Sequence, residues 1–153
     1  MIRVVLADNF SIMREGIKSV VQKVDDMTIV GVADNGKEVI SLTAEVEPDV
    51  ILMNIYMPEL DGIKVGRKIK QTNPNIKLIY LTTFIDGDFV IKGINAGADG
   101  FLYKEINEDM LIQTIRNVYA NQIVISGEAA RILAERIRNM PPNRQDKIGR
   151  AHV

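Results

Sequence analysis

The sequence lacks several features that mark whole classes of protein. Its 153 residues contain no cysteine, which excludes a disulfide framework and a thiolate metal site. The one histidine, His152, lies close to the C-terminus, where a lone histidine is seldom a ligand. No stretch approaches the roughly 18 consecutive apolar residues of a membrane span, and the N-terminal MIRVVLADN has no signal-peptide layout. We therefore expect a cytoplasmic protein without a membrane segment.

The bulk composition is that of one soluble globular domain. Hydrophobic residues make up 46% of the chain and charged residues 25%, and both values are ordinary. The net charge is −1 but is spread unevenly, because residues 126–153 hold six basic residues against three acidic ones. So short a basic excess is more typical of a solvated linker than of a nucleic-acid-binding segment.

Apolar runs and helical patterns alternate along the chain. Five runs rich in β-branched residues are apolar almost throughout, as strands buried on both faces of a parallel sheet are; they span residues 2–7, 28–33, 50–53, 77–81 and 100–103. Helical periodicity follows each run, over residues 11–22, 38–46, 61–71, 88–96 and 107–119, the last with Asn107 as its N-cap. This alternation predicts a three-layer, doubly wound α/β fold with a five-stranded parallel sheet.

The pattern changes beyond residue 120. A further helical pattern over residues 127–139 carries an apolar stripe that includes Ala130 and Leu133, and two prolines at 141–142 must end it. Residues 140–153 are polar, basic and without pattern, as in a disordered tail or a cloning remnant. We therefore divide the chain into a domain over residues 1–120, a linker with a helix over 121–139, and a tail over 140–153.

Polar side chains follow four of the five predicted strands. Asp8 and Asn9 come after the first run, Asn54 and Thr82 end the third and fourth, and Lys104 follows the fifth. The carboxyl ends of parallel strands meet at one edge of an open α/β sheet, where ligands bind. Oxygen atoms hold Mg²⁺ there, while a hydroxyl and an ammonium can bind phosphoryl oxygens. The sequence thus predicts a metal and phosphate crevice; the alternative is that each polar residue only marks the exit of its strand into solvent.

Four stretches resemble the receiver domain of two-component response regulators, in particular the LuxR/NarL type. They are VVLADNFSIMREGI (4–17), DVILMNIYMPELDG (49–62), LIYLTTF (78–84) and AGADGFLYKE (96–105). The resemblance covers residues 1 to about 120, and the helix at 127–139 is similar to the start of that family's interdomain linker. It implies a flavodoxin-like, CheY-like fold with strand order 2-1-3-4-5, and a phosphorelay module for transcription regulation that is not an enzyme.

The resemblance also implies a role for each strand-end residue. Asn54 stands at the phosphoacceptor position, and Asp8 and Asn9 stand where the family has the acidic pair that binds Mg²⁺. The remaining matches are the backbone carbonyl of Tyr56 as a metal ligand, Thr82 as the switch hydroxyl, Lys104 as the lysine that pairs with the phosphoryl group, and Phe101 as the switch aromatic.

The amide at position 54 departs from the family pattern. A neutral amide oxygen is a poor nucleophile, so Asn54 cannot form the acyl phosphate. Because Asn9 is neutral too, Asp8 is left as the one carboxylate of the set, and Mg²⁺ binding is expected to be weak or absent. Either Asn54 is an engineered substitution that blocks phosphorylation, or the chain is a naturally atypical receiver that acts as a dimerisation or ligand-sensing module.

The implied partners are a sensor histidine kinase, a second copy of the chain in the active state, and DNA. DNA would be bound only through a C-terminal domain absent from this chain, since no helix-turn-helix fits in residues 121–153. Met13, Met110 and Tyr119 are candidates for a dimer surface. A flavodoxin-like or phosphatase-type enzyme is the remaining alternative, but the sequence has no Gly-rich phosphate loop after the first run.

Overall fold

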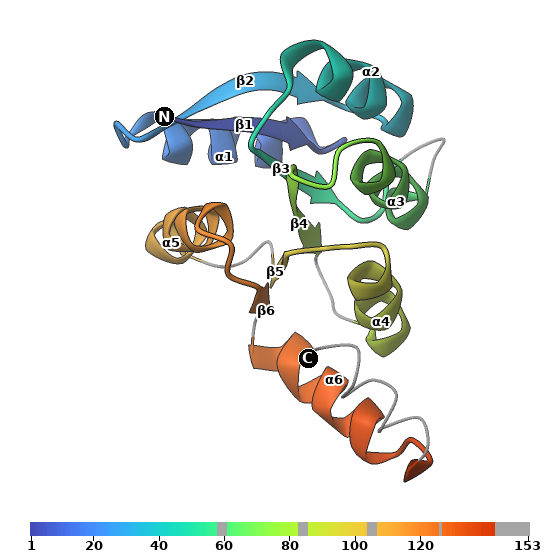
Figure 1. Cartoon of the computed structure of the whole chain (residues 1–153). Coiled ribbons are helices and arrows are strands. Elements are labelled where there is room, and N and C mark those ends of the chain that lie inside the picture. The colour runs from blue at the N-terminus through green and yellow to red at the C-terminus, as the bar shows by residue number, and fades with distance from the viewer. Residues whose placement is uncertain (58–60, 83–85, 104–106, 126, 143–153) are drawn as a thin grey trace.

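The computed structural model describes residues 1–57, 61–82, 86–103, 107–125 and 127–142. In these ranges, six parallel strands form one sheet in the order β2-β1-β3-β4-β5-β6 (Figure 1). The strands are β1 Ile2–Ala7, β2 Met27–Ala33, β3 Val50–Asn54, β4 Lys77–Thr82, β5 Gly100–Tyr103 and β6 Val124–Ile125. Because β1 lies between β2 and β3, the chain winds outward from β1 in both directions, as the doubly wound prediction requires.

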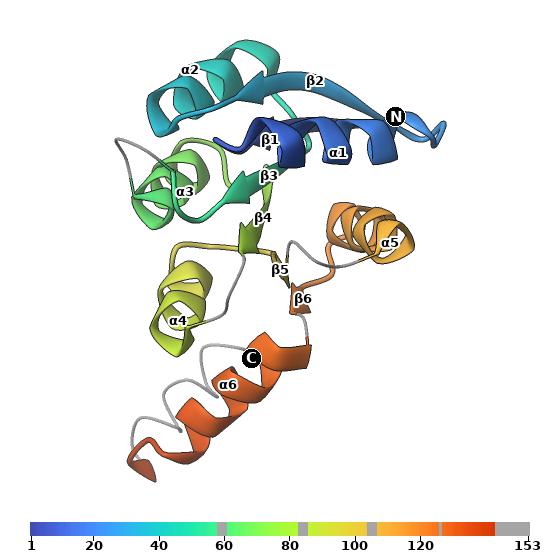
Figure 2. The ribbon, with the colours of Figure 1, turned by 180° about the vertical axis from the view of Figure 1, so that it is seen from behind.

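Helices cover both faces of the sheet. They are α1 Ser11–Gln22, α2 Gly36–Val46, α3 Gly62–Thr72, α4 Gly87–Asn95, α5 Glu108–Tyr119 and α6 Gly127–Arg138. α1 and α5 lie on one face and α2, α3 and α4 on the other (Figures 1 and 2). Alternate strand residues feed the two cores, as Val5 and Leu6 of β1 do. The three-layer prediction is confirmed. In the part of the chain described, no helix is long and apolar enough to cross a membrane.

The sheet has six strands rather than the predicted five. β6 pairs in parallel with β5, with Gly100 opposite Val124 and Phe101 opposite Ile125. Two residues are too few for periodicity to mark a strand, and their pairing depends on α5 returning the chain to the free edge of β5. The predicted order of the other five strands is confirmed.

Side chains placed just before the helices fix where four of them begin. Asn35, Asp61, Asp86 and Asn107 each accept a hydrogen bond from a backbone N–H in the first turn of α2, α3, α4 and α5, which replaces a partner that a helix N-terminus lacks. Asn107 accepts from the Met110 N–H at 2.8 Å, so the predicted N-cap is confirmed. Because these caps stand where loops from the strand ends enter helices, they also anchor the ends of those loops.

α6 packs against α4 and the adjoining core. Ala129 is fully buried, and Leu133 packs on the core that α2, α3 and α4 share. Arg136 Nη2 lies 2.5 Å from Asp88 Oδ1 at the start of α4. The predicted helix is confirmed, and Leu133 of its predicted apolar stripe packs on the core, but in the first turn Ala129 is the buried residue and Ala130 is exposed.

A largely buried ion pair joins α3 to the turn before β5. Lys70 Nζ lies 2.9 Å from Asp99 Oδ2, with the two side chains only 14% and 17% exposed. Lys70 also donates to the Ile76 carbonyl at 2.8 Å, and Asp99 accepts from the Leu78 N–H at 2.9 Å. The pair therefore ties the starts of β4 and β5 to the end of α3.

Removing the lysine of this pair should destabilise the chain. We expect Lys70→Met to lower the free energy of unfolding by about 2 kcal/mol, because it leaves a buried carboxylate and a backbone carbonyl without their cation. Lys23→Met is the matched control: Lys23 Nζ lies 3.2 Å from Glu108 Oε1 with both side chains about 60% exposed, and its loss should cost less than about 0.5 kcal/mol. Urea denaturation measures both; equal losses would contradict the expectation.

Candidate functional site

The polar residues predicted at the strand ends lie at one edge of the sheet. Asp8 follows β1 directly, Asn54 is the last residue of β3 and Thr82 is the last residue of β4. β3 and β4 run in register, with Asn54 opposite Leu81. All three side chains are buried, at 0%, 3% and 3% exposure. Lys104, predicted at the end of β5, lies outside the described residues.

A hydrogen bond between two side-chain amides connects two segments at this edge of the sheet. Asn54 Nδ2 donates to Asn9 Oδ1 at 3.1 Å, which joins the loop after β1 to the end of β3. Asn54 Oδ1 accepts from the backbone N–H of Tyr56 at 3.1 Å. Both polar atoms of the Asn54 carboxamide are thus engaged, and buried polar groups satisfied in this way hold one orientation.

Asp8 is the carboxylate of the site. Its Oδ1 accepts from the Phe10 N–H at 2.9 Å, and its backbone carbonyl accepts from Arg14 Nη1 at 2.9 Å. Arg14 was not among the sequence-predicted residues. The sequence feature that could have indicated Arg14 is its position one turn into α1, from which its side chain reaches the end of β1.

The described residues fit Mg²⁺ poorly. Mg²⁺ binds oxygen ligands and depends on carboxylate charge, yet the oxygens of Asn9 and Asn54 already accept hydrogen bonds, and Asp8 is the one acidic side chain among the predicted ligands. Among the residues described, no three acidic or histidine side chains are grouped so that they could hold a metal ion.

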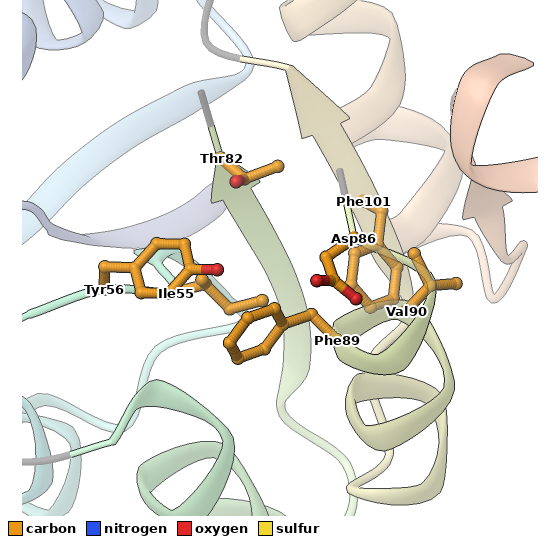
Figure 3. Close-up of a pocket in the computed structure, with 7 residues that line it drawn as sticks. All are labelled: Ile55, Tyr56, Thr82, Asp86, Phe89, Val90 and Phe101. Atoms are coloured by element: carbon orange, nitrogen blue, oxygen red, sulfur yellow. The ribbon is translucent and has the colours of Figure 1, made fainter. Parts of the chain in front are cut away.

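A small cavity lies between the residues that follow β3, the end of β4 and the start of α4. It has a volume of about 10 Å³, the space of one water molecule, and is lined by Ile55, Tyr56, Thr82, Asp86, Phe89, Val90 and Phe101 (Figure 3). The rings of Tyr56 and Phe89 meet edge to face with centroids 4.9 Å apart. Burial raises the pKa of Tyr56, and the negative charges of Asp86 and Asp61 raise it further. This ring pair joins the residues that follow β3 to the first turn of α4.

The structure brings most of the predicted residues together and adds others. Phe101 is buried at 2% exposure against the cavity, whereas Tyr56 is half exposed at its rim. Asp86 and Phe89 were missed as cavity residues, because their position depends on how α4 starts and not on any motif. Met110 and Tyr119 are exposed on α5, as a surface role would require.

A carboxylate at position 54 should destabilise the chain when no divalent cation is present. Asn54→Asp would add a second buried negative charge to the site of Asp8 and lose the donor that Asn9 accepts from, so we expect the free energy of unfolding to fall by about 1–2 kcal/mol. Asn75→Asp, at an exposed residue, is the matched control and should change little. Thermal melts in a chelator measure both variants; a higher midpoint for Asn54→Asp would contradict this account of the site.

Comparison with known proteins places this geometry in a family. Residues 4–116 match the response regulator receiver domain. The transcriptional regulatory protein YxjL of Bacillus subtilis is 39% identical over 138 residues, which cover 90% of this chain and 63% of YxjL. Response regulator GacA of Pseudomonas aeruginosa is 32% identical over 146 residues, 95% of this chain and 67% of GacA. The chain thus spans less than two thirds of YxjL, and 62% of the B. subtilis regulator YdfI.

Solved structures of response regulators have the same fold as this chain. The crystal structure of a LuxR-family two-component response regulator from Aurantimonas superposes with a TM-score of 0.82 at 28% identity and covers 88% of this chain and 96% of that one. A LuxR-family DNA-binding response regulator from Staphylococcus aureus gives a TM-score of 0.74 at 27% identity, with 78% and 99% covered. The chain belongs to the response regulator receiver domains of two-component systems, and it is related to transcriptional regulators of the LuxR/NarL type.

Proposed function

We propose that this chain is the receiver part of a two-component transcription regulator, in a form that takes up no phosphoryl group at position 54. The hydrogen bond between Asn54 Nδ2 and Asn9 Oδ1 supports this most directly. A carboxamide in that place is a poor nucleophile for phosphorus. Its neighbour is a neutral amide as well, so the site has neither the attacking carboxylate nor the charge that would hold Mg²⁺.

We assign the remaining roles by position in the family pattern. Asn54 occupies the phosphoacceptor position, and Asp8, Asn9 and the Tyr56 carbonyl occupy the metal-ligand positions. Thr82 and Phe101 are the switch residues and Lys104 is the phosphoryl-pairing lysine. The burial of Thr82 and Phe101 beside one cavity supports their pairing in a switch.

The whole protein would use this domain as its signalling input. Residues 1–120 would be the receiver, residues 121–139 with α6 the linker, and a DNA-binding domain would lie outside residues 1–153. The partners would be a sensor histidine kinase and a second copy of the chain, and the protein itself would be cytoplasmic. The names of YxjL and GacA, a transcriptional regulatory protein and a response regulator, support this arrangement.

A receiver that works without phosphorylation is the second candidate. The amide pair favours it, because both polar atoms of the Asn54 side chain are hydrogen-bonded without a metal or a phosphoryl group. Such a domain would act by dimerisation or by binding a ligand. The two candidates differ in whether the rest of the site still supports phosphoryl transfer once a nucleophile is supplied.

Phosphoryl transfer to position 54 tests the proposal. The chain, Asn54→Asp and the control Asn75→Asp are incubated with a small acyl phosphate and Mg²⁺, and intact masses are recorded. We expect one added phosphoryl group on Asn54→Asp and none on the other two. Labelling of the unchanged chain would overturn the proposal, and an unlabelled Asn54→Asp would favour the second candidate.

A further inference from the structure

Tyr80 places a hydroxyl group in the core beneath the strand-end site. It lies in β4, its side chain is fully buried, and its hydroxyl donates to the Gly62 carbonyl at 2.7 Å. Burial raises the pKa of Tyr80 well above its usual range, with the charge of Asp61 adding to the effect. The hydroxyl therefore keeps its proton near neutral pH and remains a donor to the first residue of α3.

The helix makes room for this hydroxyl. A Cβ atom on Gly66 would lie 2.1 Å from Tyr80 Oη and 2.7 Å from Leu78 Cδ2, far inside contact distance. The absence of a side chain at Gly66 thus allows the tyrosine to reach Gly62. A glycine inside a helix costs stability, so this contact comes at the expense of helix propensity in α3.

Gly62 is in turn held against the end of β3. Its N–H donates to the Ile55 carbonyl at 3.2 Å, and a Cβ on Gly62 would lie 2.4 Å from the same oxygen. Beside this contact, Tyr56 and Asp61 form an isolated antiparallel bridge. The start of α3 and the two residues after β3 therefore form one tightly packed backbone unit.

That unit sets the orientation of residue 54. The Tyr56 N–H donates to Asn54 Oδ1, and this leaves Asn54 Nδ2 directed at Asn9. We propose that Tyr80 is a positioning residue of the strand-end site. Tyr80 donates to Gly62, and Gly62 donates to the Ile55 carbonyl, which belongs to the same peptide group as the Tyr56 N–H. This peptide group orients the side chain at position 54. A role of Tyr80 in signalling rests on the proposed function, whereas the contacts from Tyr80 to Asn54 are independent of it.

Loss of the hydroxyl alone tests the positioning role. In Tyr80→Phe we expect exchange of the Tyr56 and Gly62 backbone amides to rise about tenfold, measured by NMR relative to the Leu6 amide in the centre of β1, with a shift of the Asn54 side-chain amide resonances. Thr43→Val is the control, because the buried Thr43 hydroxyl has no hydrogen-bond partner among the described residues. It should leave these signals in place. Unchanged Tyr56 and Asn54 signals in Tyr80→Phe would overturn the proposal.

A second variant separates positioning from packing. Tyr80→Phe combined with Gly66→Ala fills the space that the hydroxyl leaves but cannot restore the hydrogen bond to Gly62. We expect it to regain more than half of the stability that Gly66→Ala alone loses, while the Tyr56 and Asn54 signals stay as in Tyr80→Phe. If the Tyr56 and Asn54 signals of this double variant return to their values in the unchanged chain, Tyr80 acts only through packing, and the proposal is overturned.

Phosphoryl transfer gives an independent readout. In the Asn54→Asp background, adding Tyr80→Phe should slow labelling by the small acyl phosphate about tenfold, whereas adding Thr43→Val should not. Equal rates with and without Tyr80→Phe would overturn the positioning role. If Asn54→Asp is not labelled at all, the proposed phosphoryl chemistry fails, while the NMR measurement on the unchanged chain still decides the role of Tyr80.

Discussion

Replacing both amides of the strand-end site with carboxylates should create a Mg²⁺ site. We expect Asn9→Asp with Asn54→Asp to bind Mg²⁺ on the order of 100-fold more tightly than the unchanged chain, because each carboxylate adds a negative charge beside the metal. The Asn9–Asn54 hydrogen bond, which occupies an oxygen that a metal would need, is also removed. Calorimetric titration measures the affinities.

Each single variant should recover only part of this gain. Asn54→Asp leaves a neutral amide at position 9, and Asn9→Asp leaves one at position 54, so each adds one charge to that of Asp8. Asn75→Asp, at an exposed site, should gain nothing. If the double variant binds Mg²⁺ no better than the chain does, the missing carboxylates are not the reason for weak binding, and the site described here is not the metal site.

Adding one methyl group at Gly66 should be among the most damaging small changes in this chain. Gly66→Ala brings a Cβ atom into steric clash with Tyr80 Oη and Leu78 Cδ2. The clash forces the tyrosine away from the Gly62 carbonyl. We expect a loss of about 3 kcal/mol in the free energy of unfolding, as overpacking adds to a broken buried hydrogen bond. Urea denaturation measures the loss.

Tyr80→Phe should rescue Gly66→Ala. The phenyl ring no longer carries the oxygen that the new methyl group meets, so the double variant should regain more than half of the lost stability, a coupling expected of residues in contact. Gly16→Ala is the matched control in α1, since a Cβ there meets no atom within 4 Å; it should be neutral or stabilising. A double variant as unstable as the sum of its parts would contradict the described contact.

The fold was predictable because its signals are local. Each of the five longer strands is a run of apolar residues, and the caps before α2 to α5 are short polar side chains next to helical periodicity. β6 was not predictable, since two residues carry no period and their pairing needs the free edge of β5. The burial of Ala129 in place of Ala130 was missed for a similar reason, since it depends on how α6 packs against the rest of the fold.

The site was predictable in its residue content but not in its contacts. That Asp8, Asn54 and Thr82 gather at one edge follows from parallel strands alone. That Asn54 donates to Asn9 while accepting from the Tyr56 N–H depends on how the chain turns after β3. Gly62, Gly66 and Tyr80 contribute through close packing, and a single sequence gives no sign that these three residues meet.

The side-chain amide protons of Asn54 offer the most direct measurement of the central claim. The claim is that an amide pair between Asn9 and Asn54 has taken the place of a charged metal site. NMR of the nitrogen-labelled chain should show these protons protected from exchange, with resonances that do not move as Mg²⁺ is raised through the millimolar range. Resonances that exchange freely, or that shift and saturate below millimolar Mg²⁺, would contradict it.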